Sequence, residues 1–593
     1  MCGIAGAFDY GGSGSRPDRA GIEAACSQMI HRGPDGFGVE VLASGACVLG
    51  HRRLAIIDTS DRGLQPLFST DGRLCITFNG EIYNYRDLRR ELMDDGVQFR
   101  TETDTEIILE LYRKLGLRFV EKLRGMYAFG IWDSVRSTLV LARDPFGIKP
   151  LYFTQSGGVI TFASQVKALI AAGVKTTADA AGHVGFFLLG HVPEPFTLYK
   201  EIRALAPGSV LSVAQGGEVR IETVQRIRDI VRDQAEGAAS TLREGLTDTV
   251  RHHLIADVDV GVFLSSGLDS STLTALASEA STSAVPTVTL AFEEYLGTPA
   301  DEAPLAEAIA NHYGTAHRTE RISRRLFDDE LRRVWASMDQ PTIDGLNTYL
   351  VSKVTASSGL KVAISGLGGD ELFYGYSGFK TIPRVLPLAG RMHPMRHIGG
   401  WVRRNAEPLL RRFGRSKLAG VFEYGTEAAG IYLLYRSLNM PWQVPNMMDP
   451  DLFAAGWQEL QLLDRLRDSV EGIADDVTKV AVLETEWYMR NQLLRDADWA
   501  GMSHSLEIRV PLVDVELLKT VTALRAESQP CTKLDMARTP LKPLPDAVLN
   551  RPKSGFSIPV QTWFRPENTP RNTGYRPWAS HVYAQFTGNG YPA

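Results

Sequence analysis

A cysteine occupies position 2, immediately after the initiator methionine. Removal of Met1 is favoured when the next residue is small, and this processing would leave the thiol of Cys2 beside a free α-amino group. An α-amino group has an unperturbed pKa of about 8, so it can accept the thiol proton directly or through a water molecule. Cys2 is therefore a candidate nucleophile that needs no histidine as its base. On position alone, an ordinary N-terminal cysteine would be the simpler interpretation.

A second candidate site follows an apolar run at 260–264, which predicts a buried strand. The next residues, Ser-Ser-Gly-Leu-Asp-Ser-Ser at 265–271, are mostly small or polar and precede a helical pattern. Hydroxyls and backbone N–H groups at a helix N-terminus bind phosphate oxygens, and Asp269 could hold Mg²⁺ between phosphates. The Gly-Lys-Ser/Thr of a Walker A loop is missing. The pattern indicates a phosphate site, although such a turn also occurs without one.

Short motifs follow one another through most of the first domain. They are Cys-Gly-Ile-Ala-Gly at 2–6, His-Arg-Gly-Pro-Asp-Gly at 31–36, Gly-His-Arg-Arg-Leu at 50–54, Asn-Gly-Glu-Ile-Tyr-Asn at 79–84, Thr-Asp-Thr-Glu at 103–106, Arg-Asp-Pro-Phe-Gly-Ile-Lys-Pro-Leu-Tyr at 143–152 and Phe-Ala-Ser at 162–164. This ordered set resembles the class II, N-terminal-nucleophile glutaminase domain. The resemblance implies that Cys2 cuts ammonia from glutamine.

The same resemblance implies a role for each group near the thiol. Attack on the glutamine amide creates an oxyanion, for which the side-chain amide of Asn79 and the backbone N–H of Gly80 are suitable donors. Glycine permits the close approach. Arg53 matches the position that binds the substrate α-carboxylate, and Glu81 and Asp104 match those that bind its ammonium group. Taken singly, Arg53 or Asp104 would more often form a surface ion pair.

The loop at 265–271 looks like the PP-loop of ATP pyrophosphatases, enzymes that form an adenylate and release pyrophosphate. A second strand end, Ser-Gly-Leu-Gly-Gly-Asp-Glu at 365–371, supports this interpretation, and the two loops together resemble the asparagine synthetase family. Ser365 and Gly366 match nucleotide-contacting positions of that family. Asp370 matches an acidic position near the metal and the pyrophosphate.

Further segments contribute to the implied nucleotide site. Leu264 and Leu290 would flank the adenine, and Lys553, in a basic loop at 551–556, could neutralise the departing pyrophosphate. Without the other motifs, Lys553 would be interpreted as a solvated loop lysine. The implied cofactors are ATP and Mg²⁺, with Asp269 and Asp370 as metal ligands. The implied ATP-binding residues are Leu264, Ser265, Gly267, Asp269, Ser270, Leu290, Ser365, Gly366 and Lys553.

Hydrophobic periodicity divides the chain into two domains of different class. Residues 1–212 are predicted to be an α+β domain, for which the resemblance implies the four-layer sandwich of N-terminal-nucleophile hydrolases. Residues 239–564 are predicted to be an α/β domain, because long helices alternate with apolar strands, and the resemblance implies a Rossmann-like PP-loop domain with added helices. The predicted strands lie at 47–49, 74–78, 127–132, 138–142, 258–264, 285–292 and 360–365, and the predicted helices of the first domain at 18–30 and 105–115.

Other segments carry weaker signals. Residues 213–238 are polar and charged and are predicted to be the linker. Residues 565–593 are rich in Pro, Asn, Gly and Thr and are expected to be poorly ordered. Residues 383–445 are helical and rich in arginine, which we interpret as a solvated helical face in preference to a binding patch.

Composition limits the classes of partner. The chain has 593 residues, 44% hydrophobic and 22% charged, and its formal net charge of −5 does not favour nucleic acid. No apolar run reaches membrane-spanning length and the N-terminus lacks a signal pattern, so no membrane partner is expected and the cytoplasm is the expected location. Five cysteines in this length predict reduced thiols without disulfides or zinc. The sequence leaves a homodimer open.

The two candidate sites fit one reaction. Adenylation gives a carboxylate a good leaving group, which ammonia can displace. Free ammonia is mostly protonated at neutral pH, so delivery through an enclosed passage between the domains is expected. The leading interpretation is an ATP-dependent, glutamine-hydrolysing amidotransferase similar to asparagine synthetase, with glutamine, ATP and aspartate as its substrates.

One position bears on the acceptor acid. In the best-known asparagine synthetases the motif at 365–371 reads Ser-Gly-Glu-Gly-Ser-Asp-Glu, and its first Glu is thought to assist deprotonation of the attacking nitrogen. Here Leu367 takes that place, and leucine does no acid–base chemistry. Two alternatives therefore stay open. One is an amidotransferase for a specialised-metabolite or polysaccharide acid, and the other is a catalytically dead binding protein on the same fold.

Overall fold

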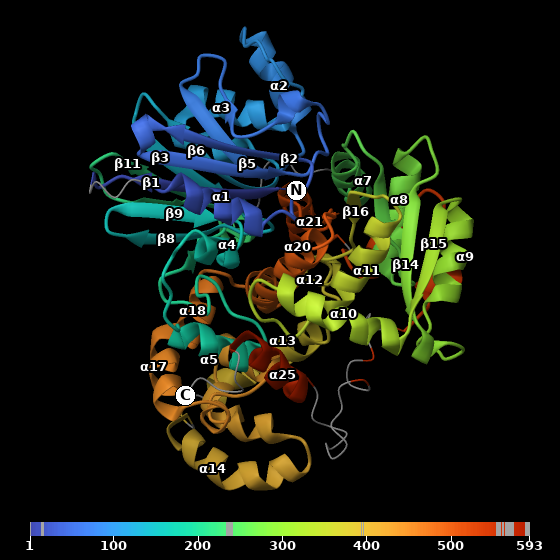
Figure 1. Ribbon diagram of the computed structural model, residues 1–593. Helices are drawn as coiled ribbons and strands as arrows, with labels where there is room; N and C mark the ends of the chain where they lie inside the picture. Colours follow the sequence, from blue (N-terminus) through green and yellow to red (C-terminus); the bar gives the residue numbers. More distant parts are fainter. Residues whose placement is uncertain are drawn as a thin grey trace.

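The computed structural model describes residues 2–12, 17–232, 241–392, 394, 396–529, 531–552, 559, 563 and 575–587. Within them, two antiparallel sheets and one parallel sheet lie in different parts of the molecule, and a group of helices lies below both (Figure 1). The two antiparallel sheets come from the first part of the chain and the parallel sheet from the second, as expected for an α+β domain followed by an α/β domain.

Both antiparallel sheets have six strands. The first has the order β10 (Arg203–Ala204), β8 (Tyr152–Ser156), β9 (Val159–Ala163), β1 (Gly3–Asp9), β3 (Cys47–Arg53), β2 (Gly36–Leu42). The second has the order β12 (Arg220–Thr223), β11 (Ser209–Ala214), β7 (Thr138–Arg143), β6 (Gly125–Asp133), β5 (Leu74–Ile82), β4 (Leu67–Phe68).

The two sheets pack face to face around one core. Phe8 and Phe162 of the first sheet meet Trp132 and Leu141 of the second in a buried cluster. Helices α1 (Arg19–Gln28) and α4 (Val166–Ala171) pack on the other face of the first sheet, and α2 (Tyr85–Asp94) and α3 (Asp104–Leu115) pack on that of the second. Side chains alternate between the two faces of a strand, so each sheet buries apolar surface on both sides.

The third sheet is parallel, with the order β15 (Ala316–Ile322), β14 (Pro286–Phe292), β13 (Val260–Phe263), β16 (Val362–Ile364), β17 (Glu507–Arg509). The chain runs from β13 through α8 (Leu268–Ala280), β14 and α9 (Ala303–Tyr313) to β15. It returns through α10 (Arg324–Ser337) and α11 (Leu346–Ser357) to β16, on the other side of β13. Open α/β sheets bind ligands where the strand order reverses in this way, here at the carboxyl ends of β13 and β16.

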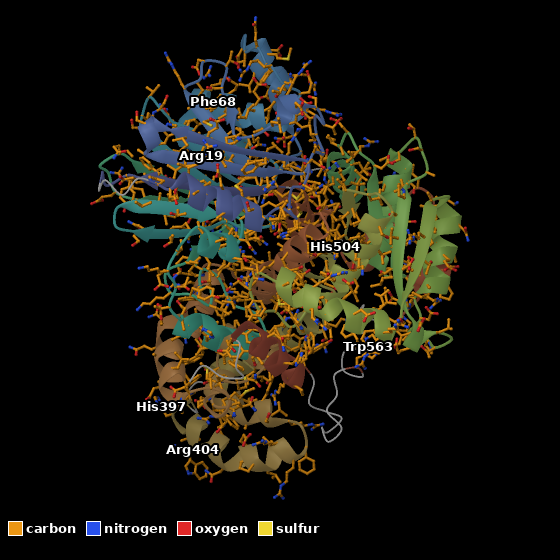
Figure 2. The ribbon with its side chains drawn as sticks, in the orientation of Figure 1. Arg19, Phe68, His397, Arg404, His504 and Trp563 are labelled. Atoms are coloured by element: carbon orange, nitrogen blue, oxygen red, sulfur yellow. The ribbon has the colours of Figure 1, made fainter. Side chains whose placement is uncertain are left out.

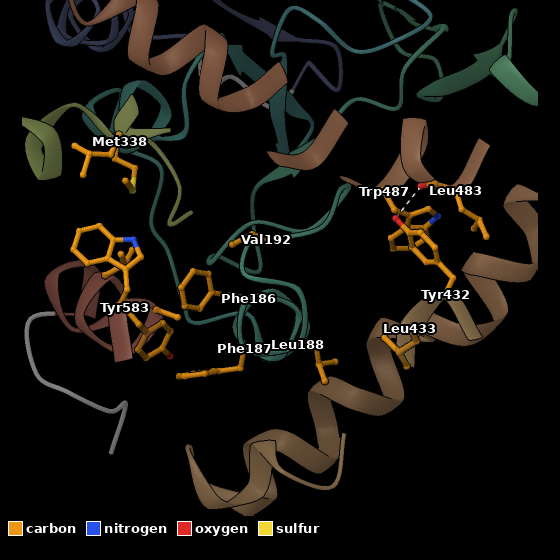
Figure 3. Packing of buried hydrophobic residues seen from close by; sticks show 14 of the residues in the cluster. Phe186, Phe187, Leu188, Val192, Met338, Tyr432, Leu433, Leu483, Trp487 and Tyr583 are labelled. Carbon is orange, nitrogen blue, oxygen red and sulfur yellow. Dashed lines mark hydrogen bonds between the residues drawn. The ribbon is translucent and has the colours of Figure 1, made fainter. Parts of the chain in front are cut away.

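A helical region brings together helices from the first and second parts of the chain. Helix α5 (Ala180–Leu189) packs with α25 (Arg576–Thr587), where Phe186 and Phe187 lie beside Tyr583 (Figure 3). The Oη of Tyr583 lies 2.6 Å from Nδ1 of His183. The segment 565–593 was expected to be poorly ordered, but α25 is an ordered helix within it. Its aromatic and aliphatic side chains are buried against α5, and this burial outweighs the polar composition around them.

The remaining described elements surround these groups. They are α6 (Ile227–Arg232), α7 (Leu242–His253), α12 (Gly369–Leu372), α13 (Gly378–Met392), α14 (Arg396–Arg412), α15 (Val421–Tyr424), α16 (Ala428–Arg436), α17 (Pro450–Leu460), α18 (Leu462–Ser469), α19 (Asp476–Leu483), the π-helix η8 (Glu484–Leu494), α20 (Arg495–Met502), α21 (Val515–Ala526), α22 (Lys533–Ala537) and α23 (Asp546–Leu549). None of the described helices is both long and apolar enough to cross a membrane.

The expected elements are present with different bounds: the strands expected at 258–264, 285–292 and 360–365 contain the shorter β13, β14 and β16, whereas the strands of the first domain are longer than expected. The strands expected at 47–49, 74–78, 127–132 and 138–142 lie within β3, β5, β6 and β7, and the expected helices correspond to α1 and α3. The linker differs from the segment 213–238, because β12 pairs with β11 and continues the second sheet to Thr223. This edge strand is mostly exposed, which explains its polar sequence. All five cysteines are free and buried, as expected for reduced thiols.

Candidate active site

The start of β1 places Cys2 against β5. The backbone nitrogen of Cys2 donates to Oδ1 of Asn79 at 2.9 Å, and its carbonyl oxygen accepts from Nε of Arg32 at 3.0 Å. Burial raises the pKa of the Cys2 thiol, and the N–H of Leu54 and the guanidinium of Arg53 oppose this shift only in part. The thiol therefore needs a base, and the geometry fits the expected use of the Cys2 nitrogen once Met1 has been removed.

Asn79 and Gly80, the expected oxyanion donors, are consecutive residues of β5, and Asn79 contacts Cys2. Since Oδ1 of Asn79 accepts from Cys2, its Nδ2 is left as a donor, and this buried nitrogen has no hydrogen-bond partner among the residues that the structure describes. A Cβ at position 80 would lie 2.1 Å from the carbonyl oxygen of Met126. Only glycine fits there. Two donors next to the thiol could stabilise the charge of a tetrahedral intermediate.

Arg53, at the end of β3, is fixed by the loop that follows it. Its Nη1 donates to the carbonyl oxygen of Ser60 at 2.7 Å, and its Nη2 donates to that of Asp58. The loop passes so close that a Cβ at Gly63 would lie 2.1 Å from Nη2. Carbonyl oxygens orient a guanidinium without neutralising it, so the positive charge stays available for a substrate carboxylate.

The two carboxylates expected to bind the substrate ammonium are buried and differ in their partners. Oδ2 of Asp104 accepts from the backbone N–H of Ile82 at 2.8 Å, and burial raises the pKa of Asp104 to about 7. Glu81 lies 3.4 Å from Nη2 of Arg509, a residue of the second domain. Burial and the neighbouring Glu507 raise the pKa of Glu81 well above its ordinary value. Glu81 thus faces both domains, which its motif gave no reason to expect.

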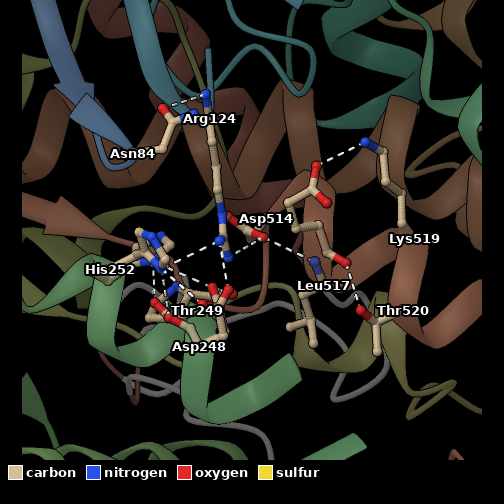
Figure 4. A network of polar contacts seen from close by, with 12 residues as sticks. Asn84, Arg124, Asp248, Thr249, His252, Asp514, Leu517, Lys519 and Thr520 are labelled. Atoms are coloured by element: carbon tan, nitrogen blue, oxygen red, sulfur yellow. Dashed lines mark hydrogen bonds and ion pairs between the residues drawn. The ribbon is translucent and has the colours of Figure 1, made fainter. Parts of the chain in front are cut away.

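Buried ion pairs connect the Cys2 site to the second domain. Nη1 and Nη2 of Arg32 donate to Oδ2 and Oδ1 of Asp498 at 2.6 and 3.0 Å, and both side chains are almost fully buried. Arg124 forms a similar fork with Asp514 and also contacts Asp248 at 2.6 Å (Figure 4). The nucleophile, through Arg32, is therefore two contacts away from α20.

The loop after β13 is tied into a compact turn by its own hydroxyls. The backbone N–H of Ser265 donates to Oγ of Ser270 at 3.1 Å, and the backbone N–H of Gly267 donates to Oγ of Ser265 at 3.2 Å. The loop after β16 packs directly on it, since a Cβ at Gly366 would lie 2.9 Å from Cβ of Asp269. Ser265, Gly267, Ser270, Ser365 and Gly366 therefore share one site, as the motifs indicated.

Asp269 and Asp370, the expected metal ligands, face the same ammonium group. Nζ of Lys533 lies 2.5 Å from Oδ2 of Asp269 and 2.5 Å from Oδ1 of Asp370. Two carboxylates from adjacent loops suit Mg²⁺, which usually takes one or two carboxylates and completes its shell with phosphate and water oxygens. No sequence motif points to Lys533 as part of this site. A capping box at Thr532 marks the start of α22, but it does not indicate where this lysine points.

Other expected contacts are placed differently. Leu264 packs in a cluster under α8 and α9, whereas Leu290 packs in the large core with α11. Their side chains belong to separate clusters, so a shared contact with adenine stays a prediction. Lys553 lies outside the described residues.

Comparison with known proteins identifies the family. Residues 1–223 match the family model described as a glutamine amidotransferase domain, and residues 241–573 match that described as asparagine synthase. Asparagine synthetase (glutamine-hydrolyzing) 1 of Bacillus subtilis (strain 168) is 31% identical over 96% of this chain and 88% of its own length. The chain belongs to the glutamine-hydrolysing asparagine synthetase family. It is therefore a glutamine-dependent carbon–nitrogen ligase.

Two further relatives of this synthetase family agree with the assignment. A putative asparagine synthetase (glutamine-hydrolyzing) of Mycobacterium tuberculosis (strain ATCC 25618 / H37Rv) is 31% identical over 95% of this chain and 88% of its own. Asparagine synthetase B (glutamine-hydrolyzing) of Escherichia coli (strain K12) is 31% identical over 65% of this chain and 67% of its own.

Breaking the pair between Arg32 and Asp498 should destabilise this synthetase strongly. Arg32→Met leaves a buried carboxylate without its partner, which should lower the free energy of unfolding by about 3–5 kcal/mol in urea denaturation. The double variant Arg32→Met/Asp498→Leu removes both charges and should recover most of the loss. Arg118→Met, at an exposed pair with Glu121, is the matched control and should cost at most about 1 kcal/mol. A double variant no more stable than Arg32→Met would contradict this account.

Replacement of Lys533 should make the melting temperature of the enzyme depend on Mg²⁺ even without nucleotide. In Lys533→Met the carboxylates of Asp269 and Asp370 lose their shared cation, so the melting temperature without nucleotide should fall, and added Mg²⁺ should restore it. The unmodified enzyme and Lys519→Met, which removes a part-buried pair with Glu516, should show no such response. An equal Mg²⁺ effect on all three proteins would refute the proposed competition between Lys533 and the metal.

Proposed function

We propose that this enzyme converts aspartate to asparagine, using glutamine as the nitrogen donor and ATP to activate the acceptor carboxylate as an adenylate. The observation that carries the proposal is the arrangement of two sites in one chain. One combines Cys2 with the unpartnered Nδ2 of Asn79, and the other combines a serine-rich loop with Asp269 and Asp370. The names of the relatives support aspartate as the acceptor. We further infer that the first domain is an N-terminal-nucleophile four-layer sandwich and the second a Rossmann-like PP-loop fold.

In the glutaminase half, the residues around Cys2 divide the work. The freed amino group of Cys2 takes the proton of the thiol, which attacks the amide carbon of glutamine. Nδ2 of Asn79 and the N–H of Gly80 donate to the oxygen that becomes negative, and the proton goes to the departing ammonia. Arg53 binds the α-carboxylate, and Asp104 binds the ammonium. Water then releases glutamate from the thioester.

An apolar cluster at the domain interface offers a path for the ammonia. It contains Met126, whose carbonyl oxygen touches Gly80, and Leu367, which follows the nucleotide-binding Ser365 and Gly366. Side chains from both domains belong to the same cluster: Tyr83, Phe146, Ile148, Met489, Leu494, Ile508, Val510 and Val513. An apolar lining keeps ammonia neutral, because a charged ammonium ion would be costly to bury there. Leu367 would contribute apolar surface to this path, although its side chain cannot act as a base.

In the synthetase half, the protein's task is to hold the nucleotide and the acceptor in place. Ser265, Gly267 and Ser270 would bind phosphate oxygens, and Asp269 and Asp370 would hold Mg²⁺. Bound ATP and Mg²⁺ supply a good leaving group for the acceptor carboxylate. Displacement of Lys533 from the two aspartates would free its ammonium group to face the pyrophosphate.

Removal of the thiol should separate the two half-reactions. Cys2→Ala should lose glutaminase activity by at least about 1,000-fold, yet with added ammonium chloride and aspartate it should release pyrophosphate at the rate of the unmodified enzyme. Pyrophosphate and AMP are measured across a panel of carboxylic acids. Normal glutamine consumption by Cys2→Ala, or formation of ADP in place of AMP, would overturn the proposal. Pyrophosphate release with another acid but not with aspartate would remove aspartate alone.

Glutamine binding should weaken below neutral pH. The pKa of Asp104 is about 7, so its carboxylate is protonated as the pH falls and loses its attraction for the substrate ammonium. The KM for glutamine should therefore rise by up to about tenfold per pH unit below 7. Asp104→Asn should raise the KM above pH 7, flatten the profile and give the KM of the unmodified enzyme at low pH, where Asp104 is already uncharged. Activity with ammonium chloride is the control, and its profile should be unchanged by the substitution.

A further inference from the structure

Helix α14 lies at the end of the molecule farthest from the two antiparallel sheets (Figures 1 and 2). One side of it packs on the rest of the protein. Gly399 is buried, and a Cβ there would lie 2.8 Å from Cα of Glu423. Arg403 donates to the Glu423 carboxylate at 2.6 Å. Because these contacts occupy one side of the helix, its other side faces solvent.

Large apolar side chains lie on that exposed side. Ile398 is 50% exposed, Trp401 64%, Leu409 60% and Phe413, just beyond the helix end, 69%. At 100° per residue these four positions fall within one arc of the helix. Leu388 and Leu418, on neighbouring segments, are exposed to a similar degree. Single exposed apolar residues are common, but several large ones within one arc of a helix favour an interaction surface, here with Asn405 and Arg412 exposed among them.

The segment that contains α14 has a large excess of positive charge. Between 380 and 422 the sequence has ten lysines and arginines and one acidic residue, Glu407, whereas the whole chain has a net charge of −5. Arg396, Arg404, Arg411 and Arg412 of α14 are exposed, and so is Arg415 beyond it. Such a surplus attracts anions and would repel a second copy of the same surface.

We propose that α14 docks this enzyme on an anionic lipid surface, which departs from the expectations of a solvated face at 383–445 and of no membrane partner, because neither took account of the exposed apolar side chains beside the arginines. Ile398, Trp401, Leu409 and Phe413 would enter the boundary between headgroups and acyl chains, while the exposed arginines contact lipid phosphates. A convex helix at one end of the molecule suits a flat surface better than a groove. Nucleic acid would use the arginines but would leave the aliphatic stripe exposed. Docking concerns where the enzyme works and is independent of the proposed acceptor.

Vesicle sedimentation of the full-length enzyme tests the proposal. The enzyme should bind vesicles of phosphatidylcholine with 30% phosphatidylglycerol at least about tenfold more tightly than pure phosphatidylcholine vesicles, and salt should weaken the binding. Arg404→Glu/Arg411→Glu/Arg412→Glu should weaken it by about 100-fold or more. Trp401→Ala/Phe413→Ala should weaken it by about tenfold or more while keeping the charge.

The matched control is Arg73→Glu/Arg90→Glu/Arg118→Glu, which changes the net charge equally at exposed sites of the first domain. It should bind vesicles like the unmodified enzyme, and all variants should keep their glutaminase activity and melting temperature. Equal binding to neutral and anionic vesicles, or equal loss in the control, would overturn the proposal. If vesicles are not bound, two results would name another partner and would also overturn the proposal. One is RNA binding that Trp401→Ala/Phe413→Ala leaves unchanged. The other is a dimer in sedimentation velocity that the α14 variants abolish.

Discussion

Buried ion pairs across the domain interface fix the position of one candidate site relative to the other. Arg32 finds its carboxylate in Asp498, and Arg509 faces Glu81, in each case across the interface. Removing an ion from water costs several kcal/mol unless an opposite charge meets it in good geometry. The interface therefore tolerates little sliding of one domain against the other.

The second site is organised by topology and by a lysine that stands between two carboxylates. The reversal of strand order at β13 and β16 brings two loops together, and glycines at 366 and 369 allow them to touch. The price of that proximity would be repulsion between Asp269 and Asp370, and Lys533 relieves it. A site built this way is ready for a divalent cation without being strained in its absence.

Much of this arrangement could be predicted from local sequence. The motif around Asn79, the loop at 265–271 and the strand ends follow from short-range patterns, because the relevant groups are neighbours in the chain. The contacts of Lys533 with Asp269, of Arg32 with Asp498 and of Glu81 with Arg509 join residues hundreds of positions apart, and no periodicity reports them. The order of α25 was also missed, since it depends on burial against α5 and not on its own composition.

Helix α5 precedes β11 and β12 in the chain, yet its apolar residues are buried among helices of the second half. Phe186, Phe187 and Leu188 would be laid bare if the first 223 residues were expressed alone. Such a fragment would contain the residues around Cys2 but would expose the apolar side chains of α5 to solvent. The N-terminal half therefore depends on the second half to bury α5. Splitting this enzyme into two separate polypeptides would require α5 to be redesigned first.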